Sequence, residues 1–594
     1  MALKGFFKKN ENLIGTGICL IVIMIFTAVR YDYYFDLNDD VLMKDILAGV
    51  YTGVPEGHNI QMLWLVSAFI SVFYKIVRGL PWYGLFLCLC HYGSLGLIFY
   101  RSLSFCKKLS GKILLLLAEG FLTVSLFLDH LVSAQYTVTC TLLAGAAAFL
   151  FFTTDINLPA KEFIRKNVGT VLLVALAYLI RSEMLLLVLP LICAAGVMKW
   201  GSEKRIFTKE NAVKYFTVIG AILASLAIGQ VSHVIAYGSR EWRTFTEYFD
   251  NRTELYDFQV LPEYAEHKEF YEKIGLTESE RQLLENYNFG LDEEIDEKLL
   301  GEIAEYAAAN RSANKPFIQN LKESAGEYYR RTVMPPSHNE SDYPWNFVII
   351  FSYLAVFITA LLIGEKKLWL RMIQILWKLV FLGAVRTVLW MWLIMRDRVP
   401  PRISHSMYLM ELCILLAMLF VQCEKLREGK QKFVPFVTGA LYGILALAIL
   451  PSSIMAADED AAQKAEANVR YEQLYSYLGN EENRDNFYFI DVYSSVAYTE
   501  KMFVNVDNSL DNYDIMGGWA CKSPLWRKKL AAFGIDNMEK ALVERADVFY
   551  VQETGADTGW LYQYYDDHDV SITMELIEVI GGEFEIYQIK ESEG

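Results

Sequence analysis

Three acidic side chains near the amino end are the first residues of this chain that could do chemistry. The segment FDLNDD places Asp36, Asp39 and Asp40 directly after an apolar stretch from about Leu13 to Val29. A carboxylate at the water edge of a membrane helix can accept the proton of a substrate hydroxyl group. An ordinary solvated loop would carry the same residues, so this segment alone does not decide between a site and a surface.

Arginines beside apolar segments are the second chemically informative group. A charged side chain near the bilayer centre costs about 2.5–3.5 kcal/mol on insertion, so arginines in such places call for a role. Arg181 interrupts the apolar run in YLIRSEM, and Arg398 and Arg402 lie in MRDRVPPRIS at the end of another. Guanidinium groups bind phosphate bidentately, so they could hold a phosphate leaving group opposite the carboxylates. The alternative is a structural set of ion pairs between helix ends.

Two histidines lie close to these groups in the sequence. His58 follows the Gly/Pro bend after the acidic segment, and His405 follows Arg402. Both are candidates for substrate binding, although a hydrogen-bonded histidine at a helix interface is the more common case. The nine cysteines form no ligand-spaced cluster with histidine, so neither a disulfide framework nor a zinc site is predicted.

Composition indicates a polytopic membrane protein. Hydrophobic residues make up 54% of the 594 residues, and aromatic residues 14%, which is more than a soluble protein of this size needs. The net charge of −15 is concentrated in the tail, because residues 456–594 hold 11 Lys/Arg and 28 Asp/Glu. An acidic tail excludes nucleic acid as a partner.

Apolar segments long enough to cross a bilayer run through most of the chain. A helix needs about 20 residues to cross about 30 Å of hydrocarbon. Beyond the first segment we expect spans near residues 82–100, 113–129, 135–153, 168–199 (a pair broken at 181–183), 214–237, 344–363, 372–395, 405–422 and 433–455. The expected total is about 11–13 transmembrane helices.

Positive charge between the spans predicts their orientation. One topology makes every basic cluster cytoplasmic, together with the amino end. The clusters are Lys4/Lys8/Lys9, Arg101/Lys107/Lys108/Lys112, Lys161/Arg165/Lys166, Lys199/Lys204/Arg205/Lys209, Lys366/Lys367 and Lys425/Arg427/Lys430/Lys432. This topology puts residues 31–81, 238–342 and 456–594 outside. It also requires that residues 59–77 do not cross, so we expect a juxtamembrane or re-entrant helix there.

Four parts follow from this pattern. They are a membrane core at 1–237 with a first outer loop at 31–58, a large helical loop at 238–343, further transmembrane helices at 344–455 and an extracytoplasmic α/β domain at 456–594. In the last part we expect a polar helix at 462–478, strands at 486–493 and 547–554, and a hairpin at 571–589 turned at Gly581-Gly582. The helical loop is too long for a simple connection, so a functional role is favoured over a cap on the bundle.

The whole arrangement resembles the GT-C superfamily of polyprenyl-phosphate-sugar-dependent glycosyltransferases. The resemblance rests on a cytoplasmic start, an acidic first outer loop, a Gly/Pro-rich turn, many further helices and an outer soluble domain. More narrowly, FDLNDD, AGVYTGVPEGHNIQ, DNRTELYDF, PPRISHS and MGGWACKSPLWRK are similar to segments of multipass members from Gram-positive bacteria.

This resemblance implies an inverting transfer of a sugar from a polyprenyl-phosphate donor to a glycan, polymer or protein acceptor at the outer face of the plasma membrane. It implies Asp40 as the base with Asp39 in support, no obligatory cofactor, and a divalent metal as an option. The residues expected to bind substrate are Asp36, His58, Arg181, Arg252 in DNRTELYDF, Arg398, Arg402 and His405.

Two other functions remain open. A transporter or flippase of lipid-linked saccharides would show inverted repeats and paired broken helices, and no internal repeat is visible. A non-catalytic cell-envelope assembly protein would use the helical loop and the tail only to bind partners. Turnover of a polyprenyl-phosphate sugar separates the first function from both.

Overall fold

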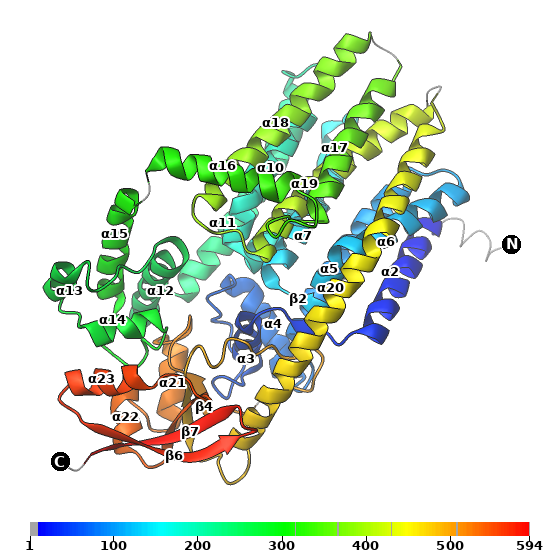
Figure 1. Ribbon diagram of the computed structural model, residues 1–594. Coiled ribbons are helices and arrows are strands. Elements are labelled where there is room, and N and C mark those ends of the chain that lie inside the picture. Colours follow the sequence, from blue (N-terminus) through cyan, green and yellow to red (C-terminus); the bar gives the residue numbers. More distant parts are fainter. Residues whose placement is uncertain (1–9, 315, 365–366, 429–430, 507–508, 593–594) are drawn as a thin grey trace.

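Long apolar helices form a bundle that carries a helical loop and a small sheet domain at one end (Figure 1). The computed structural model describes residues 10–314, 316–364, 367–428, 431–506 and 509–592. Lys4, Lys8, Lys9, Lys366 and Lys430, which the topology prediction used, lie outside the described residues. The expected class, an α-helical polytopic membrane protein with a small C-terminal α/β domain, is confirmed.

Ten described helices are long and apolar enough to cross a membrane. They are α2 (Glu11–Arg30), α5 (Trp82–Leu103), α6 (Leu109–Val132), α7 (Tyr136–Thr153), α10 (Ser182–Trp200), α11 (Lys209–Ala236), α17 (Trp345–Leu362), α18 (Leu368–Ile394), α19 (Pro401–Glu428) and α20 (Val434–Leu478). The count rises to 11 if α8 (Ala160–Lys166) and α9 (Val168–Ile180), which meet at 41°, form one span. The expected number was about 11–13.

The segment predicted not to cross the membrane forms a short helix. α4 (Trp64–Ile76) has 13 residues, so it is about 20 Å long and shorter than the hydrocarbon core. Together with α3 (Asn38–Ala48), it lies at the end of the bundle that carries the sheet domain (Figure 1). We call this the domain end, which comprises residues 31–81, 237–344 and 456–592.

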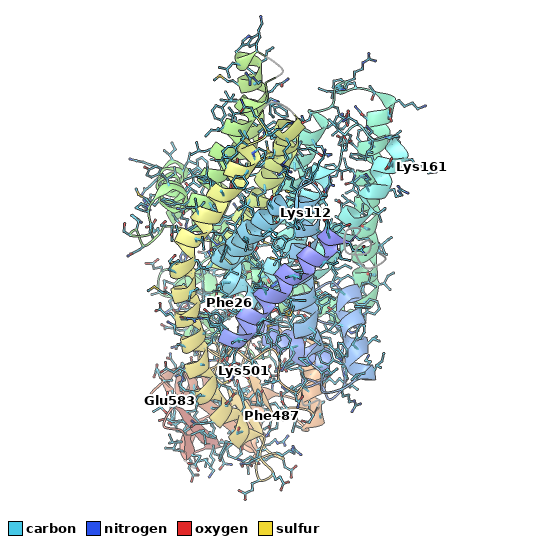
Figure 2. The ribbon with its side chains drawn as sticks, turned by 90° about the vertical axis from the view of Figure 1, so that its right-hand side faces the viewer. Phe26, Lys112, Lys161, Phe487, Lys501 and Glu583 are labelled. Carbon is cyan, nitrogen blue, oxygen red and sulfur yellow. The ribbon has the colours of Figure 1, made fainter. Side chains whose placement is uncertain are left out.

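Basic side chains mark the opposite end of the bundle. Figure 2 places Lys112 and Lys161 away from Phe487 and Glu583 of the sheet domain. The clusters around Lys112 and Lys161 therefore lie at the end that the charge pattern predicted to be cytoplasmic.

The helical loop between α11 and α17 contains several helices. They are α12 (Arg240–Thr253), the π-helical turn η1 (Glu254–Phe258), α13 (Lys268–Ile274), α14 (Glu278–Glu285), α15 (Glu297–Asn314) and α16 (Phe317–Val333). Its buried side chains, such as Phe245 and Leu283, pack in one hydrophobic core with Phe489 and Trp526 of the sheet domain. The loop and the C-terminal domain are therefore joined by packing and are not independent units.

The C-terminal domain contains a five-stranded mixed sheet of order β4-β3-β5-β7-β6. Its strands are β3 (Phe487–Ile490), β4 (Tyr513–Ile515), β5 (Val548–Glu553), β6 (Ile572–Ile580) and β7 (Phe584–Glu591). β3 is parallel to β4 and β5, whereas β7 is antiparallel to both β5 and β6. Helices α21 (Pro524–Ala532), α22 (Met538–Glu544) and α23 (Gly559–Asp567) complete the domain. β3, β5 and the hairpin of β6 and β7 lie where the sequence predicted them, whereas the short strand β4 was not predicted.

One boundary differs from the prediction. The sequence indicated a membrane helix ending near residue 455 and a separate polar helix at 462–478. The structure has one continuous helix of 45 residues, α20, which runs from the bundle into the sheet domain (Figure 1). The residues between the two expected helices, MAADEDAAQK, are mostly good helix formers without glycine or proline, so nothing in them ends the helix.

Candidate functional site

A two-stranded parallel pair fixes the acidic segment at the domain end. β1 (Tyr34–Phe35) pairs with β2 (Ser133–Ala134), and the N–H of Asp36 donates to the carbonyl of Ala134 at 3.0 Å. α3 starts three residues after β1, so Asp39 and Asp40 occupy its first turn. Carboxylates there interact favourably with the helix dipole.

A glycine ends α3 and turns the chain toward the bend that contains His58. Gly49 has φ of +89°, and a Cβ atom there would lie 2.5 Å from the backbone nitrogen of Pro55. Only glycine fits both the left-handed conformation and this close approach. The acidic segment is therefore held at both ends by local backbone geometry.

Asp40 is completely buried. Its Oδ1 accepts a hydrogen bond of 2.7 Å from the hydroxyl of Tyr83, and its Oδ2 has no partner. Burial raises the pKa of the Asp40 carboxyl well above its ordinary value, and the hydrogen bond from Tyr83 offsets this only in part. A carboxyl group without exposed surface is better suited to positioning than to accepting a proton from a large acceptor molecule.

Asp39, one residue earlier, is partly exposed and lies within electrostatic reach of Arg181. Arg181 lies at the break between α9 and α10. Burial lowers the pKa of its guanidinium group, but neighbouring groups outweigh this and raise the pKa. The groups are the Tyr136 hydroxyl and the carboxylates of Glu183, Asp39 and Asp257. Asp39 of the acidic first loop therefore acts electrostatically on a distant arginine, while no hydrogen bond or ion pair joins the two side chains among the described residues.

Several contacts hold Arg181 in place. Its guanidinium donates to the side-chain oxygen of Gln61, pairs with Glu183 at 3.2 Å and lies 5.0 Å from the centre of the Tyr136 ring. Gln61 also accepts from the Tyr136 hydroxyl at 3.2 Å. Gln61 and Tyr136 are site residues that the sequence reasoning missed, because an amide and a phenol in apolar segments carry no distinctive signal.

Arg398 joins this group through an acidic residue of the helical loop. Its guanidinium pairs at 2.8 Å with Asp257 of η1, and both side chains are about one-third exposed. Asp257 also acts electrostatically on Arg181, so the charge of one carboxylate influences both arginines. Arg252, one turn earlier, lies 5.6 Å from the Tyr256 ring centre, and its buried Nε has no partner. The motif DNRTELYDF thus supplies Asp257, which pairs with Arg398, and Arg252, which lies beside aromatic rings.

Asp36 faces a lysine that the sequence reasoning did not select. Lys464 of α20 lies 3.4 Å from Asp36, 2.7 Å from the Ser133 hydroxyl and 2.7 Å from Asp460. Burial raises the pKa of Asp36, whereas Lys464 and, more weakly, Arg402 lower it. Arg402 therefore acts on Asp36 only electrostatically, and no hydrogen bond or ion pair joins them among the described residues. The Asp460–Lys464 spacing of four residues was the available signal for this pair.

The two histidines have aromatic and polar partners of their own. His405 lies 2.9 Å from the Nε2 of His130 and stacks on Trp345 at 5.4 Å. His58 lies 3.2 Å from Glu56 and stacks on Trp242 at 5.0 Å. In the described part of the chain no hydrogen bond or ion pair joins either histidine to the three aspartates. This is the interface arrangement that the sequence left open as the alternative to substrate binding.

The assembled site has two parts. A partly exposed carboxylate, Asp39, lies near the guanidinium of Arg181, with Arg398 and Arg402 nearby at the same end. Asp36 and Asp257 already have cationic partners at 3.4 and 2.8 Å, so neighbouring side chains balance the negative charges of these carboxylates. Such an arrangement can bind an anionic phosphate and accept a proton beside it.

Comparison with known proteins gives remote likenesses only. No protein-family model matches the chain, and no curated protein matches it. Two solved structures are similar to it, both of ArnT from Cupriavidus metallidurans. The crystal structure bound to undecaprenyl phosphate has a TM-score of 0.39 and 10% identity, covering 97% of this chain and 98% of that one. The apo crystal structure has the same score and identity, covering 99% and 98%.

Proposed function

We propose that the protein is a membrane glycosyltransferase that transfers a sugar from a polyprenyl-phosphate donor to a hydroxyl group of an acceptor at the domain end of the bundle. The observation that carries this proposal is the electrostatic interaction of the partly exposed Asp39 with the guanidinium of Arg181 at the domain end. The resemblance of the acidic loop to GT-C enzymes and the polyprenyl-phosphate ligand of one remote structural neighbour are consistent with it.

In this reaction the acceptor oxygen attacks the anomeric carbon of the sugar. The bond between that carbon and the phosphate oxygen breaks, and the electron pair leaves with the polyprenyl phosphate. Asp39 takes the proton of the acceptor hydroxyl group. Arg181, with Arg398 and Arg402, stabilises the negative charge that remains on the phosphate. Attack from the face opposite the phosphate inverts the anomeric centre.

This proposal exchanges the roles that the sequence suggested for the two neighbouring aspartates. Asp40 has no exposed surface, and its carboxyl group accepts a hydrogen bond from the Tyr83 hydroxyl. We therefore assign Asp40 to positioning the first turn of α3. Asp39 keeps the exposure that a base for a large acceptor needs.

The test uses purified full-length protein in lipid nanodiscs with radiolabelled polyprenyl-phosphate sugars and a panel of glycan acceptors. We expect release of polyprenyl phosphate together with labelled product, and loss of both in Asp39→Asn. Asp32→Asn is the matched control, because Asp32 lies in the same loop, is exposed and pairs with Lys501 at 2.9 Å. Full activity in Asp39→Asn would refute the assignment of the base.

The same assay separates the alternative functions. A transporter of lipid-linked saccharides would move the intact donor between leaflets and release no polyprenyl phosphate. An assembly protein would do neither. Either result with wild-type protein and a bound donor would overturn the proposed enzyme.

A further inference from the structure

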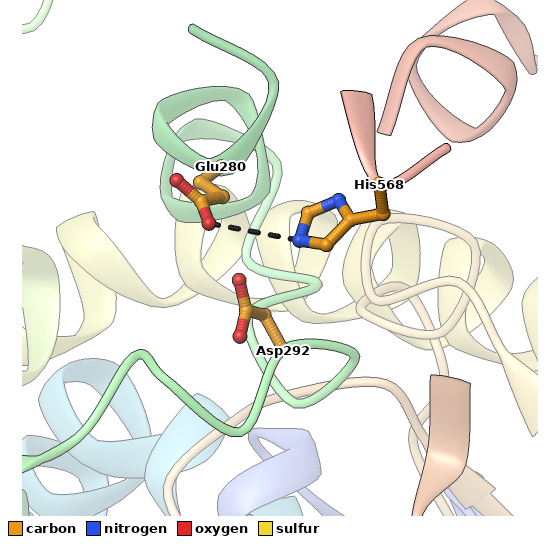
Figure 3. Close-up of side chains that lie close together, drawn as sticks. All are labelled: Glu280, Asp292 and His568. Atoms are coloured by element: carbon orange, nitrogen blue, oxygen red, sulfur yellow. Dashed lines mark ion pairs between the residues drawn. The ribbon is translucent and has the colours of Figure 1, made fainter. Parts of the chain in front are cut away.

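A second group of polar side chains meets between the helical loop and the C-terminal domain. Glu280 lies on α14, Asp292 in the connection from α14 to α15, and His568 directly after α23 (Figure 3). One potential ligand atom from each of the three residues lies within 4.8 Å of the other two. The proposed transfer reaction uses none of these residues.

One oxygen of each carboxylate accepts hydrogen bonds that orient the side chain. The other oxygen faces the centre of the three-residue group. The Oε2 of Glu280 accepts from the backbone N–H of Thr277 at 2.6 Å and from its hydroxyl at 3.0 Å, as part of a capping box. Its Oε1 lies 3.8 Å from the Nε2 of His568. The Oδ1 of Asp292 accepts from the N–H of Glu294 at 2.7 Å, whereas its Oδ2 is buried without a partner.

The imidazole is oriented in the same way. The Nδ1 of His568 lies 2.8 Å from the backbone carbonyl of Tyr564, which can only accept, so Nδ1 carries the hydrogen. In the neutral ring the lone pair of Nε2 then points toward the Oε1 of Glu280. A ring N–H that donates to a backbone carbonyl while the other nitrogen faces carboxylates is the usual arrangement of a metal-binding histidine.

Burying two carboxylates in this group costs free energy unless a positive charge lies beside them. Glu280 and Asp292 are only 5% and 3% exposed. Two buried carboxylates this close need a shared proton, a protonated imidazole or a metal cation between them.

The cavity next to Glu280 and Asp292 favours a cation. A cavity of about 230 Å³ is lined by Glu280 and Asp292 and by further carboxylates on Glu294, Asp296 and Glu302. A concave surface with one sign of charge raises the local concentration of cations. The cavity also has room for a water molecule that would complete the coordination of an ion held by three side chains.

The distances are close to those of a metal site. Zn²⁺ binds histidine nitrogen and carboxylate oxygen at about 2.0–2.2 Å, so tetrahedral ligand atoms lie about 3.3–3.6 Å apart. The 3.8 Å between His568 and Glu280 and the limit of 4.8 Å on all three separations mean that each pair of ligand atoms would approach by at most about 1.5 Å on binding an ion. A histidine ligand favours Zn²⁺ over Ca²⁺ and Mg²⁺, which prefer oxygen ligands only, whereas the two carboxylates also suit Mn²⁺.

We propose that Glu280, Asp292 and His568 bind a divalent transition-metal ion that fastens the helical loop to the C-terminal domain. The ion joins α14 and the α14–α15 connection to the segment after α23, across the core that these two parts share. Its role is structural, and it is independent of the proposed transfer reaction.

The experiment measures metal binding to purified full-length protein in detergent, without any sugar donor. Bound metal is removed with EDTA, the protein is dialysed, and Zn²⁺ is titrated by calorimetry, with metal content determined by mass spectrometry and Tm by thermal unfolding. A parallel titration uses Mn²⁺. We expect about one equivalent of metal and a rise in Tm on its addition.

Three variants remove one ligand each and preserve the local structure. Glu280→Gln retains the capping box, Asp292→Asn retains the acceptor for the Glu294 N–H, and His568→Gln removes the ring nitrogen. We expect each to weaken the Kd at least about tenfold and to abolish the rise in Tm, because loss even of an outer-shell partner costs 10- to 100-fold. Glu302→Gln is the control, since Glu302 lines the same cavity but is exposed and outside the group.

Two results would overturn the proposal. Wild-type protein that binds neither Zn²⁺ nor Mn²⁺ would show that a proton holds the carboxylates together. A Kd that weakens as much in Glu302→Gln as in Asp292→Asn would show that the cavity attracts cations without a defined site. The wild-type titration decides the first point even if a variant fails to fold.

Discussion

Arg398, between α18 and α19, forms an ion pair of 2.8 Å with Asp257 in the π-helical turn of the helical loop. Asp257 also acts electrostatically on Arg181, so its negative charge influences two cations from different parts of the bundle. In the proposed reaction the phosphate of the donor would compete with Asp257 for these guanidinium groups.

Neutralising Asp257 is therefore expected to tighten binding of a polyprenyl phosphate. Asp257→Asn removes the competing negative charge, whereas Arg398→Gln removes a donor to the phosphate. Because a hydrogen bond to a charged group contributes about 1.5–3 kcal/mol, we expect Arg398→Gln to weaken the Kd about tenfold or more. Native mass spectrometry of the protein with added lipid measures both changes. Equal affinity in the two variants would place the phosphate elsewhere.

The two neighbouring aspartates are expected to respond differently to the same substitution. Asp39→Asn should lower the rate by about 10²- to 10⁴-fold, the usual contribution of a general base. Asp40→Asn should retain most of the activity, because a neutral amide replaces a carboxyl group whose pKa is already raised, and its oxygen can still accept from Tyr83. Rates with saturating donor check this, and the opposite order would return the role of base to Asp40.

Lys464 is expected to hold the first loop to α20. Lys464→Met leaves the partly exposed Asp36 and Asp460 without their common cation, so the free energy of unfolding should fall by about 1.5–3 kcal/mol, the usual contribution of a hydrogen bond to a charged group. Lys464→Arg should recover most of this loss because the charge remains. Thermal unfolding of both variants in the same detergent measures the effect. Equal Tm values for wild type and Lys464→Met would mean that the contact is not structural.

Stability is expected to depend on the ionisation of Asp511. Burial and the nearby Asp45 raise the pKa of the Asp511 carboxyl from its ordinary value of 3.8 to about 7. The fold therefore favours the protonated form, and this contribution is complete below the ordinary value and is lost as the pH rises through about 7. Asp511→Asn should raise Tm relative to wild type more at pH 8 than at pH 5. Asp536→Asn, at an exposed site in the same domain, should show no such difference.

The orientation of the bundle can be tested with two introduced cysteines. Ser110→Cys and Ala160→Cys lie at the end opposite to the sheet domain, and Glu578→Cys lies on the exposed face of β6. If the amino end is cytoplasmic, a membrane-impermeant thiol reagent added outside intact cells labels only position 578. Labelling of 110 and 160 from outside would reverse the topology.

Much of the architecture was predictable because hydrophobic periodicity and length depend on local sequence. The spans, the short helix at Trp64–Ile76 and the hairpin at Gly581-Gly582 all follow from segments of fewer than 30 residues. The break at Arg181 was also visible, because a charged residue between two apolar runs rarely continues a helix inside a membrane.

The partners within the site were less predictable, because they depend on how distant helices pack. Asp36, Asp39 and Arg181 were identified from the sequence, but their pairing with Lys464 and Gln61 was not. The burial of Asp40 could not be read from its position either. Adjacent residues on a helix point about 100° apart, and only the packing of α3 against Tyr83 decides which one faces inward.

The unbroken length of α20 makes the domain end of the protein sensitive to the thickness of the bilayer. Its 45 residues span about 68 Å, and Lys464 lies about 45 Å from its first residue. A helix that tilts by about 10° to match a thinner bilayer would displace Lys464 sideways by roughly 8 Å unless the contacts around it resist. The thickness of the bilayer would then change the position of Lys464 relative to the carboxylate of Asp36.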